Sequence, residues 1–407
     1  MASYNVLYNG TSSQPIKVLV ASDTATSGAI PLAGSAGTIA PGFLPTTGGS
    51  GPLVVAFFAG NGRNGSITLA ASGTSTVANL IAWDAAASEY YLLADLQAHN
   101  LTLSGSVHLR AEGFRIFVLD TLTMNANSTI HANGGNASGT TAGIGAAPRN
   151  ATSASLSGGA SGAAGVTAIN SAVTGAANTP TSGVTRRGSS GADGGAASLI
   201  GGASSAGGTA AGGTLWSDPT NGLPNAVLGP QAVAANSQKM AGGYGGASGA
   251  ARANSGNTGT SGGGGGGAGV IAISAQNVVF NSGATISADG GSGGNGTATA
   301  GGASGGGGGG GGAGAIEAVF LAVSGSGTLT ARGGAGGNAA ATSGPSARAA
   351  VGGNGSNGGW IEVFCGSGSV TTDVTGGTGG TGATSDGSPA TNGTSGSAGT
   401  VWAAPAA

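Results

Sequence analysis

The fold is decided by the stretch GGGGGGAGVIAISAQNVVFNSGATISADGGSGG at residues 262–294, which recurs twice further along the chain. The second copy reads GGGGGGGGAGAIEAVFLAVSGSGTLTARGGAGG at 305–337, and the third reads NGSNGGWIEVFCGSGSVTTDVTGGTGG at 354–380. Gly269, Gly314 and Gly359 each open a copy and lie 45 residues apart. A fixed period of this size is typical of a repeat architecture in which each unit packs against its neighbours.

Each unit begins with short runs in which apolar residues alternate with small or polar ones, and this indicates strands. Gly and Asn at 281–283 and Gly and Ser at 324–327 are suited to the turns between the strands. The sequence therefore predicts an all-β chain: a strand-rich stack, like a solenoid or β-helix, with ordered glycine-rich segments. The residues expected in its interior are Val270, Ile271, Phe280, Ile286, Ile316, Val319, Leu329, Ile361 and Val363.

The composition is extreme, with 91 Gly among 407 residues, 6% charged residues, 4% aromatic residues and a net charge of −2. Glycine contents of this order without a G-X-Y register normally indicate disorder. If the glycines are ordered, their amides must pair, because ordering glycine has a high entropic cost. Strand ladders and packed polyglycine segments would both provide this pairing. The only basic run is Arg186-Arg187, so we expect no nucleic-acid partner.

The single cysteine, Cys365, excludes an intrachain disulfide, and we expect it to be a small buried residue of the strand around it. The N-terminal residues MASYNVLYNG lack the basic and apolar regions of a signal peptide. No window is apolar for long enough to span a membrane. We therefore expect a protein made in a cytoplasm, without export or membrane insertion.

The chain divides into four regions by pattern. Residues 1–50 combine short strands with a proline-containing linker. Residues 51–135 are a strand-rich block whose closing TIHANGG matches the TISADGG and TLTARGG of the later repeats. Residues 136–261 are glycine-rich, with an aromatic and proline-containing island at 215–244, and residues 262–407 hold the 45-residue repeats and a tail.

The order of these blocks resembles a family of glycine-rich bacteriophage virion proteins. The resemblance rests on FFAGNGRNGSITL at 57–69, NLTLSGS at 100–106, GFRIFV at 113–118, STIHANGGN at 128–136 and the terminal repeats. The segment GTIAPGFLP at 37–45 looks like the one that follows the attachment region of tail fibres. The polyglycine runs also resemble glycine-rich fibre-tip adhesins, in which glycine helices pack side by side.

The resemblance implies a structural tail-fibre or appendage protein that attaches the virion to its host. It implies a homotrimer, docking on other virion proteins through residues 1–50, a host glycan or protein receptor, and no cofactor. A capsid decoration protein or head fibre is an alternative from the same class. A bacterial surface adhesin is disfavoured by the missing export signal, and a glycan-cleaving tailspike by the lack of a carboxylate pair.

Candidate catalytic and metal-binding residues are few. Glu317 and Glu362 occupy matching positions in two repeats, and we expect both to point outward into solvent. His108 and His131 alternate with apolar residues, which predicts that they lie on the polar face of strands. Without cysteine partners or ligand spacing, no zinc site is expected. We therefore predict no enzyme, no catalytic residue and no metal.

Receptor binding is assigned to the island, because aromatic rings and fixed turns are what binding surfaces use. Repetitive Ser, Thr and Gly faces carry less specificity. The candidate binding residues are Arg186, Arg187, Trp216, Lys239 and Tyr244. A structural role, with Trp216 capping a glycine-packed layer, is the alternative. If the island does not bind, loop tips expected around Gly294 and Gly337 are the next candidates.

Overall fold

The computed structural model contains strands and no helix in the residues that it describes, which confirms the all-β prediction. These residues are 21–22, 30–31, 60–146, 156, 158–169, 171–177, 189, 191–199, 204–205, 242–253, 257–299, 302–343, 348–385 and 390–404. None of them belongs to a helix that could cross a membrane. The chain forms two compact units, Met1–Val54 and Val55–Ala407. In the first, β1 (Ala21–Ser22) pairs in parallel with β2 (Ile30–Pro31), and the other strands expected before residue 50 lie outside the described residues.

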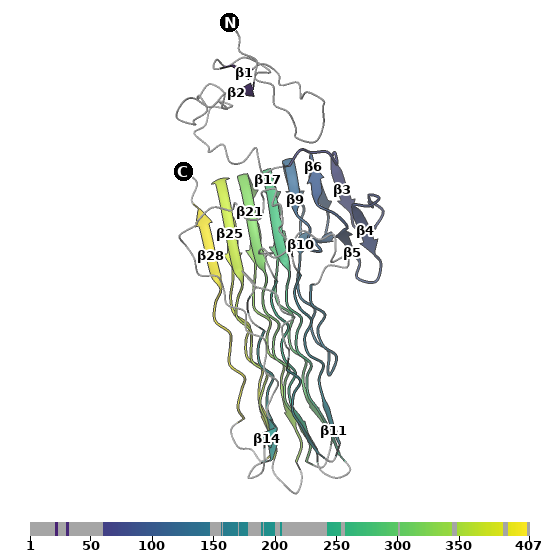
Figure 1. The fold of residues 1–407 in the computed structure, drawn as a ribbon, viewed down its shortest axis with the longest axis vertical. Helices are drawn as coiled ribbons and strands as arrows, with labels where there is room; N and C mark the ends of the chain where they lie inside the picture. Colours follow the sequence, from purple (N-terminus) through teal and green to yellow (C-terminus); the bar gives the residue numbers. More distant parts are fainter. Residues whose placement is uncertain are drawn as a thin grey trace, which may run out of the picture. The chain divides into compact units, whose positions relative to one another are not determined.

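Two mostly parallel sheets form the strand-rich part of the second unit (Figure 1). The eight-stranded sheet has the order β28-β25-β21-β17-β9-β7-β3, with β6 also paired to β9. Its strands are β3 (Ile67–Ala70), β6 (Leu96–Ala98), β7 (Leu101–Ser104), β9 (Ile116–Met124), β17 (Val270–Phe280), β21 (Ala315–Gly325), β25 (Trp360–Ser367) and β28 (Thr400–Ala404).

The seven-stranded sheet has the order β26-β22-β18-β10-β8-β5-β4, in which only β4 and β5 pair antiparallel. Its strands are β4 (Ile81–Asp84), β5 (Glu89–Leu92), β8 (His108–Arg110), β10 (Thr129–His131), β18 (Thr285–Ser287), β22 (Thr328–Thr330) and β26 (Thr371–Asp373). The β4–β5 hairpin packs Trp83 edge-on to Tyr90, whose buried hydroxyl donates to the carbonyl of Ala70 at 2.6 Å. This bond satisfies the polar end of an otherwise apolar side chain.

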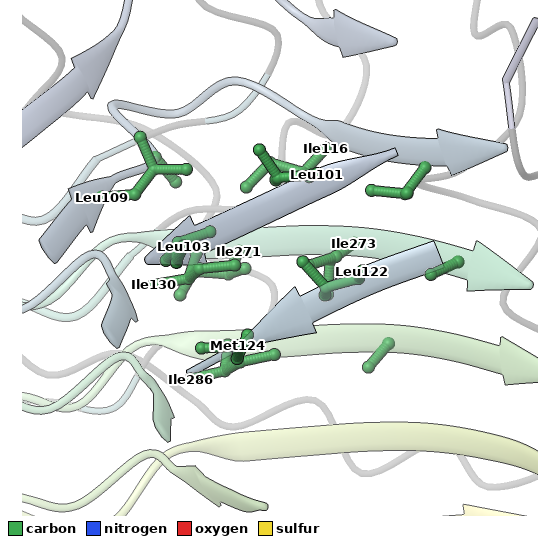
Figure 2. Close-up of a cluster of buried hydrophobic side chains, with 14 of the residues drawn as sticks. Leu101, Leu103, Leu109, Ile116, Leu122, Met124, Ile130, Ile271, Ile273 and Ile286 are labelled. Atoms are coloured by element: carbon green, nitrogen blue, oxygen red, sulfur yellow. The ribbon is translucent and has the colours of Figure 1, made fainter. Parts of the chain in front are cut away.

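The main core lies between the two sheets, where the inward residues of each strand meet (Figure 2). Ile271, Ile316 and Ile361 are aligned across β17, β21 and β25, so the 45-residue register of the sequence is the register of the sheet. All nine residues expected in the interior are buried, and Cys365 is buried as well. Burying each such side chain contributes about 1.5–3 kcal/mol.

The outer face of the eight-stranded sheet is also covered, and here the sequence prediction was wrong. Val270, Val319 and Trp360 form a second apolar cluster with Leu156, which comes from a distant segment. Glu317 and Glu362, expected in solvent, lie in this layer and are 0% and 6% exposed. Strand alternation did place them on the outer face, but that face is not solvated, since parallel sheets are commonly covered on both sides.

Each repeat follows the same path. After a long strand in one sheet and a short strand in the other, the chain leaves the sheets, reverses direction and returns to start the next long strand (Figure 1). We call the glycine-rich runs between the sheets and these reversals the glycine bundle. Its described segments are 132–146, 158–166, 189, 191–196, 242–250, 261–269, 288–296, 306–314, 331–339, 351–359, 374–382 and 391–399.

Successive amides in the glycine bundle donate to three different neighbours in strict rotation. Between residues 262 and 269, amides 262, 265 and 268 donate to carbonyls 306, 309 and 312. Amides 263, 266 and 269 donate to carbonyls 139, 135 and 132, and amides 264 and 267 to carbonyls 163 and 160. A three-residue period is that of the polyproline II helix, which has no internal hydrogen bonds. The bundle is therefore made of packed polyglycine helices, one of the two possibilities that the sequence left open.

Glycine is required in the bundle because the neighbouring backbones leave no room for a side chain. A Cβ atom built on Gly265 would lie 2.0 Å from the carbonyl oxygen of Gly291, and one on Gly310 would lie 2.0 Å from that of Gly334. Such contacts are far inside van der Waals distance. The close approach that excludes Cβ is the same approach that brings most amides of the bundle within hydrogen-bonding distance of a neighbouring carbonyl.

Asparagine side chains cover the amides that face out of the bundle. The Oδ1 atom of Asn295 accepts from the amide of Asn338 at 2.8 Å, and the Oδ1 atom of Asn338 accepts from the amide of Thr381 at 2.9 Å. Asn354 and Asn357 bond the amides of Thr394 and Ser397 in the same way. Every third residue points outward, so the glycine–glycine–X pattern follows from a three-residue helix with one exposed side.

Short antiparallel pairings form where the bundle segments turn. Their strands are β11 (Thr167–Ile169), β12 (Ala172–Val173), β13 (Ala197–Leu199), β14 (Ser204–Ser205), β15 (Ala251–Arg252), β16 (Thr258–Thr260), β19 (Thr297–Ala298), β20 (Ser304–Gly305), β23 (Ala340–Ala341), β24 (Arg348–Ala350) and β27 (Ala383–Thr384). Gly294 and Gly337, expected at loop tips, are instead buried inside the bundle, where they donate to the carbonyls of Gly263 and Gly308. The prediction for these two residues was wrong because each is a glycine of a glycine–glycine–X triplet, and the glycines of a triplet face neighbouring segments of the bundle.

Candidate functional site

A polar groove of about 460 Å³ lies on the outer face of the seven-stranded sheet. It is open to solvent and crosses β8, β10, β18 and β22. Its lining residues are Ala87, Glu89, His108, Thr129, His131, Asn133, Thr285, Ser287, Asp289, Thr330 and Arg332. All but Ala87 are polar or charged.

The floor of the groove is part of a ladder of mostly hydroxyl-bearing residues set by the strand register, and this ladder continues beyond the groove. Thr129, Thr285, Thr328 and Thr371 are aligned across β10, β18, β22 and β26. Two residues further along, His131, Ser287, Thr330 and Asp373 are aligned in a second row. In the first three of these strands the residue between the two rows is a buried Ile or Leu, so alternation sends both rows outward. Adjacent members of a row are about 4.8 Å apart.

An ion-pair cluster closes one end of the groove. The carboxylate of Glu89 lies 3.1 Å from Nη1 of Arg110 and 2.9 Å from Nε2 of His131. Burial raises the pKa of Glu89, but the hydrogen bond with His131 and the charges of His131 and Arg110 together outweigh it, so the pKa is below its usual value. Glu89 is therefore ionised at neutral pH. His131 has a second nitrogen, Nδ1, that is buried without a hydrogen-bond partner in the described part of the chain.

Arg110 also binds Glu112, which follows it two residues later. Its Nε donates to Oε1 of Glu112 at 2.6 Å, and its Nη2 contacts the same oxygen. Glu112 is buried and has a φ of 52°, a left-handed conformation that costs about 1–3 kcal/mol for a residue other than glycine. The two contacts with Arg110 hold this conformation, so Arg110 connects the groove to the turn between β8 and β9.

The opposite end is built around Asp289. Its carboxylate accepts from Nε and Nη2 of Arg332 at 3.2 and 2.9 Å and from the hydroxyl of Thr330 at 3.1 Å. Hydrogen bonding to Asp289 raises the pKa of Arg332. The Oδ1 atom of Asn133 accepts from the amide of Asp289 at 2.8 Å, which fixes the backbone there. The acceptors and donors at this end are thus held rigidly by one another.

A second hollow of about 450 Å³ shares Asn133 with the groove. Its remaining lining residues are Arg110, Glu112, Ala132, Gly135, Ile144, Gly145 and Ala146. Ile144 is 78% exposed, which is unusual for an isoleucine in an ordered segment. An apolar surface therefore lies beside the polar groove.

The arrangement does not provide the carboxylate pair of a glycoside hydrolase within the groove. Glu89 is on β5 and Asp289 lies two residues after the end of β18, with β8 and β10 between the two strands. Three strand spacings amount to about 14 Å. The two catalytic carboxylates of glycosidases are about 5–9.5 Å apart. Among the described residues, no group of three His, Cys, Asp or Glu side chains is placed to hold a metal ion.

Of the residues predicted to bind a receptor, only Tyr244 can be located. It lies in the glycine bundle, 8% exposed, and its carbonyl accepts from the amide of Gly312 at 2.7 Å. Trp216, Lys239, Arg186 and Arg187 lie outside the described residues. Their role in binding stays a prediction, and the area that Tyr244 offers to a ligand is small.

The groove itself was missed by the sequence analysis, although its histidines were correctly placed on the outward side of their strands. His108 is exposed and lies beside His131, with ring centroids 6.4 Å apart. The available signal was the repeat TIHANGG, TISADGG, TLTARGG, in which charged or aromatic residues replace small ones at equivalent positions. Because the strands are in register, charged and aromatic residues at equivalent repeat positions lie together on one face of the sheet.

Comparison of the chain with models of known protein families, with functionally characterised proteins and with solved structures gave no match.

Proposed function

We propose that this chain is a structural, non-enzymatic protein of a bacteriophage virion, part of a tail fibre or similar appendage that attaches the particle to its host. The observation that carries the proposal is the glycine bundle. It orders long runs of backbone by hydrogen bonds and ends in short antiparallel pairings where the segments reverse direction. Loops held by a rigid scaffold are a common site of recognition. Low charge and the near absence of Lys and Arg in the bundle segments also suit a protease-resistant extracellular particle.

We infer further that the repeats wind as a solenoid. Each 45-residue unit contributes one strand to each sheet and two segments to the bundle, in a constant order. In such an array each unit contacts mainly its neighbours. Homotrimer formation, assembly with other virion proteins through residues 1–50, and a host glycan or protein receptor belong to the same proposal.

The test is a deletion of residues 1–50 in the phage that encodes the chain. The truncated protein should keep the melting temperature of the full chain but be missing from purified particles. Immunogold labelling of wild-type virions should place the protein on the tail or its fibres. Label on the capsid would instead identify the chain as a capsid decoration protein or head fibre, which is the alternative function. Normal incorporation of the truncated protein would contradict the role of residues 1–50.

A further inference from the structure

We propose that the groove on the seven-stranded sheet binds a neutral saccharide chain, laid across the strands. The described residues that line the groove are other than those to which receptor binding was assigned. The proposal can be tested on the purified protein whether or not the virion assignment holds. Its basis is the geometry and chemistry of the groove floor, the two groove ends and the neighbouring hollow.

The floor offers hydroxyl groups at a regular spacing. Thr129 and Thr285 belong to one row and are half-buried, so a ligand crossing the strands meets equivalent hydroxyls on β10 and β18. Ser287 and Thr330 of the next row are buried in the floor. A hydroxyl both donates and accepts a hydrogen bond, and the hydroxyls of Thr285 and Thr330, which donate to the Gly283 carbonyl and to Asp289, remain acceptors. This suits a polymer whose own hydroxyls recur along its length, because each can exchange its bonds with water for bonds with the floor.

The groove ends supply fixed polar groups of higher specificity. Glu89 and Asp289 are each held by an arginine or histidine, so their carboxylates do not have to be ordered when a ligand binds. The Oδ1 atom of Asn133 accepts from the backbone amide of Asp289, and this bond fixes the orientation of the Asn133 side-chain amide. Binding to groups that are already ordered loses less conformational entropy.

The pairing of the charged groups selects against anionic ligands. Two carboxylates, those of Glu89 and Asp289, and one guanidinium, that of Arg332, line the groove together with two histidines. Arg332 is bonded to Asp289, and Arg110, which pairs with Glu89, is bonded to Glu112 as well. An anionic chain would have to compete with these carboxylates for the guanidinium groups, whereas a neutral chain leaves the ion pairs intact.

The neighbouring hollow supplies the apolar contact that sugar rings also require. A pyranose ring has hydroxyls at its edge and C–H groups on its faces. Ile144, with Ala132 and Ala146, provides an apolar wall in the hollow, next to Asn133. A lipid or another mainly apolar ligand fits less well, because the groove floor has no apolar residue except Ala87 at its margin.

The experiment is calorimetric titration of the full chain with neutral hexasaccharides (maltohexaose, cellohexaose, xylohexaose and hexa-N-acetylchitohexaose) and with an anionic hyaluronan hexasaccharide. At least one neutral sugar should bind, and hyaluronan should not. The double variant Thr129→Val/Thr285→Val should weaken binding about 25-fold, about fivefold for each lost hydroxyl. Thr371→Val is the matched control, since it is in the same ladder but does not line the groove, and it should bind as wild type does.

A second variant, Ala87→Gln, narrows the groove without altering a strand and should also weaken binding. Melting temperatures within a few degrees of wild type would show that all variants fold. Failure of every neutral sugar to bind would overturn the proposal. So would preferential binding of hyaluronan, or equal loss of affinity in the double variant and in Thr371→Val.

Discussion

In the two sheets the interior consists of side chains, whereas in the glycine bundle it consists of backbone. Ile271, Ile316 and Ile361 fill the space between sheets, and removing volume there would leave a cavity. In the bundle the space between segments is narrower than one Cβ atom, and adding volume there would separate hydrogen-bonded chains. The same chain thus alternates, every 45 residues, between stabilisation by apolar burial and stabilisation by backbone hydrogen bonding.

Because the bundle has a backbone interior, the chain can have few large apolar residues and still be ordered in both its sheets and its glycine-rich segments. A hydrogen bond contributes about 1 kcal/mol net, less than a buried isoleucine. In the bundle, however, most amides make one, including all from 261 to 269. Many backbone hydrogen bonds, made in turn to three neighbouring segments, therefore take the place of a few large buried side chains.

The largest effect is expected from placing a charge in the side-chain interior. Ile316→Asp would bury an unpaired carboxylate at a position that is 0% exposed and should cost about 4–5 kcal/mol. The measurement is thermal melting followed by circular dichroism. Ser324→Asp, at the exposed end of the same strand, is the control and should change little. If Ile316→Asp melts at the wild-type temperature, the shared register of the repeats is contradicted.

The next effect comes from adding one methyl group to the backbone interior. Gly310→Ala would bring Cβ within 2.0 Å of the carbonyl oxygen of Gly334, and the segments would have to separate. We expect a loss of about 3 kcal/mol. The outward-facing control Ala335→Ser should stay within about 0.5 kcal/mol of wild type. If the glycine and control variants are equally stable, the bundle is not as tightly packed as described.

A smaller effect is expected at the surface of the bundle. Asn338→Ala removes the acceptor for the amide of Thr381 and should cost about 1 kcal/mol. Thr378→Ala changes an exposed residue of the neighbouring segment and should be close to neutral. Hydrogen exchange at the amide of Thr381 should rise in the first variant and not in the second. Unchanged protection in Asn338→Ala would show that water replaces the side chain at no cost.

The smallest effect concerns pH, in the sheet region alone. Because the pKa of Glu89 is lowered in the folded state, its ion pairs stabilise the fold above pH about 4.5, and this contribution is lost as pH falls through the lowered value. Between pH 7 and pH 3 the wild type should therefore lose more melting temperature than Glu89→Gln. Parallel melting curves for the two proteins over this range would exclude a role for Glu89 in acid sensitivity.

The strand region was predictable because its information is carried by side chains. The alternation around Ile271 and Ile316 gave the strands, and the 45-residue spacing gave the register. The burial of Glu317 was not predictable, because alternation identifies the outer face but not what covers it. Leu156, which packs in that layer, is more than 100 residues away in sequence.

The bundle and the groove were harder to anticipate, for different reasons. Glycine has no side chain, so a run such as 305–312 contains no pattern that distinguishes a strand ladder from a polyglycine helix. Only the asparagines at every third position, as at 354 and 357, hint at the period. The groove combines Glu89 with Asp289, residues 200 positions apart, and it depends on the sheet order that brings β5 and β18 into one face.

The central claim, that the glycine bundle is a hydrogen-bonded interior and not a set of solvated loops, is tested most directly by hydrogen–deuterium exchange. Peptides covering 261–269 and 306–312 should exchange as slowly as peptides from β17 and β21, because every amide in these two ranges is bonded. Exchange of these glycine peptides at the rate of an unstructured chain, with β17 still protected, would contradict the account.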